Sequence, residues 1–145
     1  MTRTVLRRSP IIGLISVALI IGATNVAAQE LVAHSSAEIE SLSRNEARLY
    51  FTMRVKAWPN GALVKVFVLP DDHELHRLFA KSVLGLFPYQ LRRVWDRQLF
   101  SGTGRAPTTV ADEHEMLERI ASTPGAVGYT NGPVNHPNLR VLEVR

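Results

Sequence analysis

The stretch Leu63-Val64-Lys65-Val66-Phe67-Val68-Leu69 decides the fold class of this chain. It is apolar at every position except Lys65, and Pro70 ends it. A strand with one solvent-exposed face would alternate between apolar and polar residues. A continuous apolar run therefore predicts a strand that other elements cover on both faces. We therefore expect a parallel or mixed sheet flanked by helices.

Helical patterns surround this strand. Ser43 precedes Glu46 by three residues, which is the spacing of a capping box, and it predicts a helix that carries Ala47, Tyr50 and Phe51 on one face. Three further helix starts are predicted in the same way, at Asp71 with Glu74, at Pro88, and at Asp112 with Glu115. The second of these four helices is expected to place Leu75, Leu78, Phe79, Ser82 and Leu86 on one side.

Shorter apolar segments complete the pattern. Residues 31–33, 126–130 and 139–144 predict strands, and Gly128 within the second of them predicts a close approach by another element. The clusters at 58–61 and 131–133 contain Asn, Gly and Pro and predict turns. Strands mixed with amphipathic helices indicate an α/β domain.

The first 28 residues have the features of a secretory signal peptide. Residues 1–9 carry three arginines and no acid, an apolar run follows at 11–23, and Val26-Ala27-Ala28 is a small-residue cleavage signature. The run is shorter than the ~20 residues that a spanning helix needs. We expect cleavage after Ala28, a periplasmic location, no stable membrane anchor afterwards, and one domain over residues 29–145.

Charge and composition exclude several classes of function. The net charge is +4, from 17 Lys and Arg against 13 Asp and Glu, and removal of the three leader arginines leaves 14 against 13. This small imbalance is unlike the basic surface of a nucleic-acid-binding domain. No cysteine is present, and no Gly-x-Ser-x-Gly nucleophile motif occurs. We therefore expect no enzymatic activity, no cofactor and no nucleic-acid partner.

The loop Phe100-Ser101-Gly102-Thr103-Gly104-Arg105 is the candidate ligand-binding segment. Ser101, Gly102, Thr103 and Arg105 offer backbone N–H groups, hydroxyls and a guanidinium, which are the groups that an oxyanion such as phosphate requires. The alternative interpretation, which takes precedence, is a helix C-terminus and connector in which Gly102 or Gly104 adopts positive φ.

The segment Asp71-Asp72-His73-Glu74-Leu75-His76 is a weaker candidate for a metal site. His73 and His76 lie three residues apart and could face one ion on a helix. Acids in the first turn of a helix explain the same residues without a metal. We expect no metal site here.

The order of landmarks resembles a known family. Ser43-Arg44-Asn45-Glu46, Trp58-Pro59-Asn60-Gly61, the strand ending at Pro70, Phe100-Ser101-Gly102 and Thr123-Pro124-Gly125-Ala126-Val127-Gly128-Tyr129 follow one another as in small bacterial proteins related to the phosphate-binding component of phosphate ABC transporters. These proteins belong to the type 2 periplasmic binding protein superfamily. The resemblance implies a single lobe of that fold, with a mixed sheet flanked by amphipathic helices.

The resemblance also implies a role in solute recognition, with phosphate or another small oxyanion as ligand. The family's Ser-Gly-Thr run and arginine lie between the central strand and the next helix, where this chain has Leu69-Pro70-Asp71-Asp72-His73-Glu74. No phosphate ligand of the family is therefore carried over to this sequence. The alternative is a ligand-free interaction module that docks onto a sensor, a transporter or another membrane partner in the cell envelope.

Overall fold

The computed structural model describes residues 29–102 and 104–145. The predicted signal peptide lies outside these residues. Within them, no helix combines the length and the apolar character that crossing a membrane requires.

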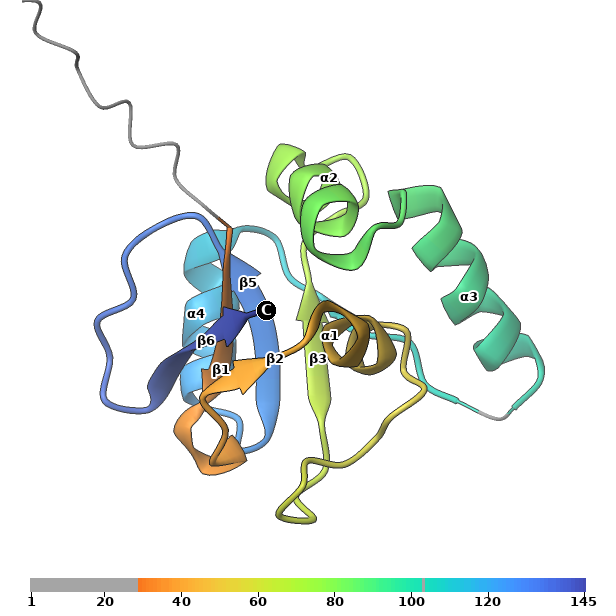
Figure 1. Ribbon diagram of the computed structural model, residues 1–145. Coiled ribbons are helices and arrows are strands. Elements are labelled where there is room, and N and C mark those ends of the chain that lie inside the picture. The colour runs from red at the N-terminus through yellow and green to blue at the C-terminus, as the bar shows by residue number, and fades with distance from the viewer. Residues whose placement is uncertain (1–28, 103) are drawn as a thin grey trace, which may run out of the picture.

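A mixed six-stranded sheet forms the centre of the molecule, in the order β2-β6-β1-β5-β3-β4 (Figure 1). β3 runs parallel to both β4 and β5, whereas β1 is antiparallel to both β5 and β6. The mixed sheet expected from the sequence is therefore confirmed. The strands are β1 (Glu30–His34), β2 (Ser41–Leu42), β3 (Lys65–Val68), β4 (Thr108–Thr109), β5 (Ala126–Thr130) and β6 (Leu139–Val144).

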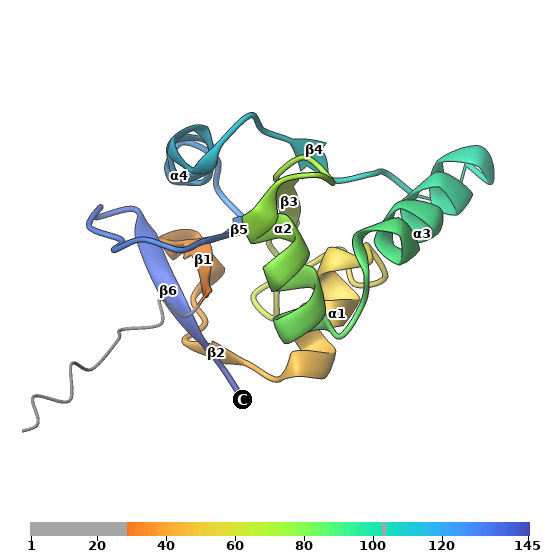
Figure 2. The same ribbon diagram turned by 90° about the horizontal axis from the view of Figure 1, so that it is seen from above.

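Helices cover both faces of the sheet. Seen from above, α4 lies on one face, and α1 and α2 lie on the other, with α3 farther out beside them (Figure 2). The helices are α1 (Arg44–Phe51), α2 (Glu74–Phe79), α3 (Pro88–Phe100) and α4 (Glu113–Ala121), with a 3-10 turn at Ser35–Ala37 and a π-helical turn at Ala80–Leu84 that continues α2.

Side-chain caps fix the starts of α1 and α4 as the sequence predicts. The Glu46 N–H donates to Ser43 Oγ at 3.1 Å, and the Ser43 N–H donates to the Glu46 carboxylate at 2.7 Å, which completes the capping box. Ala47, Tyr50 and Phe51 are buried, as expected. Asp112 caps α4 by accepting from the Glu115 N–H at 2.9 Å.

The predicted cap of α2 is wrong. His73 is the N-cap residue, and its Nδ1 accepts from the Leu75 N–H at 3.2 Å. Asp71 points to Arg92 of α3 instead, because two charge-assisted hydrogen bonds to a guanidinium are stronger than one cap bond to a neutral amide.

Two predicted patterns are shifted in the structure. β3 begins at Lys65, two residues later than expected, because Leu63 forms an isolated antiparallel bridge with Ala57 and is 69% exposed. After α2, the wider π-helical turn changes the helical register. Leu84 is therefore buried in place of the predicted Ser82, which is exposed.

The core joins both helical layers to the sheet. Trp58 and Trp95 are buried, and each indole N–H donates to a backbone carbonyl at 2.9 Å. Gly128 in β5 allows Met116 and Ile120 of α4 to lie where a Cβ would stand, which confirms the close approach predicted there. The core thus holds β5 rigidly between the two helical layers.

Candidate functional site

The carboxyl ends of β3, β4 and β5 meet at one end of the sheet, where α2 and α4 begin. Ligands of open α/β sheets bind outside the carboxyl ends of the parallel strands, so this end is the first place to examine. We call it the carboxyl end. It consists of residues 69–76 after β3, residues 110–113 after β4, and Thr130 and Asn131 at the end of β5.

A buried hydrogen-bond network lies beneath the carboxyl end. The Leu69 N–H donates to the Tyr129 hydroxyl at 2.9 Å, and this hydroxyl shares a hydrogen bond with Nδ1 of His76. The phenol ring of Tyr129 stacks on Phe79 with 4.0 Å between the ring centroids. Burial raises the pKa of Tyr129 and lowers the pKa of His76. Both side chains are therefore neutral at neutral pH.

The second ring nitrogen of His76 has no hydrogen-bond partner among the described residues. The nearest acid is Asp71, whose Oδ1 lies 3.9 Å from Nε2 and therefore beyond hydrogen-bond distance. The pKa of His76 stays low because burial outweighs the attraction of this carboxylate. His76 is thus a structural imidazole held against the loop that follows β3.

Arg92 of α3 forms a two-point ion pair with Asp71 beside this network. Its Nε and Nη2 donate to the two carboxylate oxygens of Asp71, each at 2.9 Å, and its guanidinium lies 5.2 Å from the ring centroid of Trp95. The hydrogen bonds from Arg92 lower the pKa of Asp71. This pair fastens α3 to the loop after β3, and it leaves Arg92 committed to an internal anion.

Glu113 occupies the donors at the end of β5. Its Oε2 accepts from the Thr130 hydroxyl at 3.0 Å and from the Asn131 N–H at 2.9 Å. Together with Glu74 it also borders a surface hollow of 260 Å³, whose other lining residues are His73, Leu75, Leu78 and Asn131. Two carboxylates in this position oppose an incoming phosphate.

The predicted loop lies far from the carboxyl end. α3 begins beside α2 and runs away from it, so the residues after Phe100 follow the far end of the helix (Figure 1). Ser101 is the C-cap of α3, and Gly102 adopts φ +68°. This geometry matches the alternative interpretation as a helix C-terminus. Thr103 lies outside the described residues, and Arg105 is exposed.

His73 and His76 do not face one ion. His73 caps α2 through Nδ1, whereas His76 is directed into the core toward Tyr129. Within residues 29–102 and 104–145, no group of three His, Asp or Glu side chains is placed to hold a metal ion.

Sequence reasoning missed the His76–Tyr129 pair. One signal was present, because His76 lies next to Leu75 and three residues before Phe79, on the apolar side of α2. A histidine in that position is buried and needs a polar partner. The partner comes from β5, 53 residues away in sequence, and no local pattern identifies it.

Solved structures share this fold, although no family model and no curated protein matches the chain. A phosphate ABC transporter substrate-binding protein from Clostridium perfringens, solved with bound phosphate, aligns with a TM-score of 0.61 and 12% identity over 81% of this chain. PstS from Borrelia burgdorferi aligns with a TM-score of 0.58 and 13% identity, again over 81% of this chain. An ABC-type phosphate transport receptor from Vibrio cholerae aligns over the same share of the chain with a TM-score of 0.56 and 10% identity.

The alignments cover 46% of the first protein and 47% of the other two, so this chain spans about half of their length. The resemblance seen in the sequence is thereby confirmed at the level of the fold. The chain has the fold of one lobe of a phosphate ABC transporter substrate-binding protein.

Proposed function

We propose that the protein is an exported, non-catalytic recognition domain that binds a small oxyanion without the usual phosphate motif. The observation that carries this proposal is the shared fold with a lobe of a protein solved with bound phosphate. The leader-like residues 1–28 support export to the periplasm, with residues 29–145 as the mature domain.

The donors at the carboxyl end are already bound by carboxylates of the protein. Arg92 is bound by Asp71, and the donors of Thr130 and Asn131 are bound by Glu113. An oxyanion would have to displace a carboxylate from either set of donors. Oxyanion contacts are therefore expected elsewhere, and Arg105 of the predicted loop remains the leading candidate.

The absence of catalysis is also part of the proposal. His76 and Tyr129, whose pKa values are shifted by burial, are directed toward each other inside the protein. Neither reaches a surface where a substrate could bind, so they support the fold and perform no proton transfer.

A ligand screen tests the proposal directly. The purified protein beginning at Gln29 would be titrated by calorimetry with phosphate, sulfate and small carboxylates, and its melting temperature would be measured with each. We expect heat release and a rise in melting temperature with at least one oxyanion. The absence of both heat release and a change in melting temperature, with every anion at millimolar concentration, would contradict oxyanion recognition.

A second candidate function is docking to an envelope protein, and one surface favours it. Phe87 and Tyr89 at the start of α3 are 50% and 61% exposed, and their rings stack with centroids 5.8 Å apart. They border a hollow of 570 Å³ whose other lining residues include Arg77 and Arg93 as well as the acids Asp71 and Asp72. Exposed aromatic and arginine side chains are enriched at protein interfaces.

A pull-down with matched bait proteins tests the docking function. The wild-type protein is expected to retain a defined envelope protein in the absence of any added ligand, and the double variant Phe87→Ala, Tyr89→Ala is expected to lose it. Equal recovery by both baits, or recovery of nothing above background, would count against docking through this surface.

A further inference from the structure

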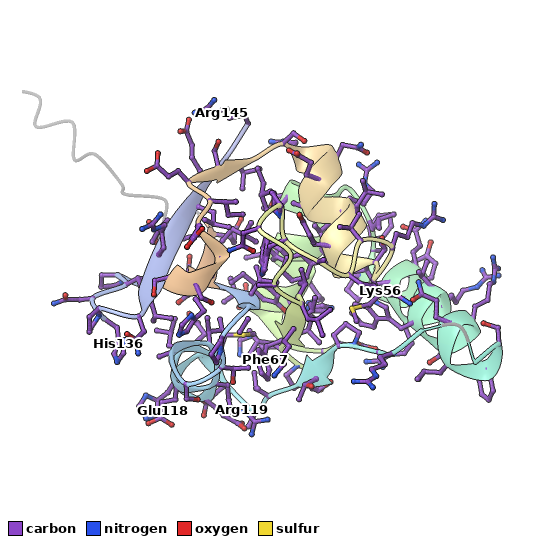
Figure 3. All side chains as sticks on the ribbon, turned by 90° about the horizontal axis from the view of Figure 1, so that it is seen from below. Lys56, Phe67, Glu118, Arg119, His136 and Arg145 are labelled. Carbon is purple, nitrogen blue, oxygen red and sulfur yellow. The ribbon has the colours of Figure 1, made fainter. Side chains whose placement is uncertain are left out.

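A third hollow lies at the opposite end of β3, where this strand begins. It measures 240 Å³, and its lining residues come from three separate segments of the chain. Met53 and Lys56 follow α1, Leu63, Val64 and Lys65 lead into β3, and Arg105 belongs to the connector after α3. We call it the basic hollow. Figure 3 shows Lys56 close to α3, on the side of the molecule where these segments meet.

The charges around the basic hollow are all of one sign. Its described lining residues include the three cations Lys56, Lys65 and Arg105 and no acid. Within residues 29–102 and 104–145, neither Lys65 nor Arg105 forms an ion pair. Lys65 and Arg105 therefore raise the local potential and attract anions. Arg92 at the carboxyl end shows the opposite case, a cation already neutralised by the protein.

The remaining lining residues are apolar. Leu63 is 69% exposed, and Val64 and Met53 are half-buried beside it. An inorganic ion would leave these side chains in water, whereas a ligand with a small apolar group would cover them. The volume lies somewhat below the range of roughly 300–1,000 Å³ that is usual for drug-sized ligands, so it suits a single small ring or a short chain.

Met53 lines the basic hollow from a strained backbone position. Its φ is +60°, in the left-handed region where glycine is usual after a helix C-terminus. A non-glycine residue in this region costs about 1–2 kcal/mol. Strained residues of this kind cluster at active sites and ligand-binding sites.

We propose that the basic hollow binds an anionic ligand that joins one phosphate or carboxylate group to a small apolar group. Lys65 and Arg105 bind the oxyanion, with Lys56 adding positive charge, and Leu63, Val64 and Met53 contact the apolar part. This inference rests on the proposed recognition of an oxyanion, and it places that recognition at the end of the sheet opposite to the carboxyl end.

Calorimetry with matched variants tests the inference. The purified protein would be titrated with phenyl phosphate and with inorganic phosphate, at low and at high salt. We expect phenyl phosphate to bind more tightly than inorganic phosphate and its affinity to fall with salt. The double variant Lys65→Gln, Arg105→Gln is expected to lose at least tenfold in affinity. The control Lys81→Gln, Arg140→Gln removes the same charge from exposed positions outside the basic hollow and is expected to keep wild-type affinity.

The outcomes separate this inference from the proposed function. Binding that is unchanged in the Lys65→Gln, Arg105→Gln protein overturns the basic hollow as the site and leaves oxyanion recognition standing. An equal loss in the control variant, or equal affinities for phenyl phosphate and phosphate, also overturns it. No heat with any anion would overturn both, while circular dichroism of each variant confirms that it is folded.

Discussion

The two ends of β3 use their charged groups in opposite ways. At the carboxyl end, Asp71 is paired with Arg92, and Glu113 is bound to Thr130 and Asn131. At the amino end, Lys65 and Arg105 face a hollow that contributes no acid. The first arrangement stabilises the fold, and the second leaves charge available to bind a ligand.

This difference shows that a shared fold does not by itself place the same charged groups at corresponding positions. The alignments with phosphate-binding proteins follow the backbone, and the backbone of this lobe does bring three strand ends together. The side chains at that place are acids and buried neutral rings. Function depends on the site and not on the fold alone.

The largest expected effect comes from breaking the buried network at the carboxyl end. Tyr129→Phe removes the hydroxyl that satisfies the Leu69 N–H and His76 Nδ1, and it leaves both groups buried without a partner. Each such group costs about 1–3 kcal/mol, so we expect the free energy of unfolding to fall by about 2–6 kcal/mol. Urea denaturation measures it. A loss below about 1 kcal/mol would show that the network contributes little.

The pH dependence of stability tests the neutral state of His76. Folding lowers the pKa of His76 below its usual value of 6.5. As the pH falls through 6.5, His76 therefore binds a proton in the unfolded chain before it does so in the folded protein. The free energy of unfolding is therefore expected to decrease from pH 7.5 to pH 5.5. Urea denaturation at both pH values measures this change.

Two controls assign the pH effect to His76. An NMR titration of its imidazole is expected to show a midpoint below 6.5. His114→Gln, at an exposed position on α4, is expected to keep the wild-type pH dependence. A His76 midpoint at or above 6.5 would contradict the account.

A smaller effect is expected when the surface pair is broken. Asp71→Asn removes the carboxylate that binds Arg92, but both side chains are about 40% exposed, so solvent screens much of their attraction. We expect a loss of about 1 kcal/mol in the free energy of unfolding, with little change in phosphate binding. Strong phosphate binding by Asp71→Asn would mean that the carboxyl end is a binding site that Asp71 blocks.

The smallest expected effect concerns the amino end. Met53→Gly relieves the positive φ but loosens the unfolded chain, so its free energy of unfolding is expected to exceed that of Met53→Ala by only about 0.5 kcal/mol. The same variant is expected to weaken the binding of phenyl phosphate, since the methionine side chain lines the basic hollow. Met53→Ala serves as a comparison because it keeps the strain while shortening the side chain. Because the Met53 side chain also packs against the core, a Met53→Gly protein that is less stable than Met53→Ala would show that the conformation is not strained.

Local patterns predicted most of the fold. The capping box at Ser43, the cap at Asp112 and the apolar run through Val68 each depend on residues close together in sequence, and the structure confirms them. The errors arose where a distant residue competed with a local one. Asp71 binds Arg92, 21 residues away, and does not cap α2.

The candidate site was harder to predict than the fold. Arg105 is identifiable from sequence as a cation beside glycines, but Lys56 and Lys65 lie 40 or more residues earlier and join it only through the packing of the chain after α1 against the connector after α3. Nothing in their local sequence separates them from ordinary surface lysines. Their grouping is a property of the tertiary structure.

NMR mapping of ligand contacts is the most direct test of the contrast between the two ends. Amide shifts of the wild-type protein would be followed during a titration with phenyl phosphate. The account predicts that the shifts concentrate at Lys56, Leu63, Val64, Lys65 and Arg105, while His73, Glu113 and Asn131 remain unchanged. Shifts concentrated at His73, Glu113 and Asn131 would contradict it, because they would place anion recognition at the carboxyl end.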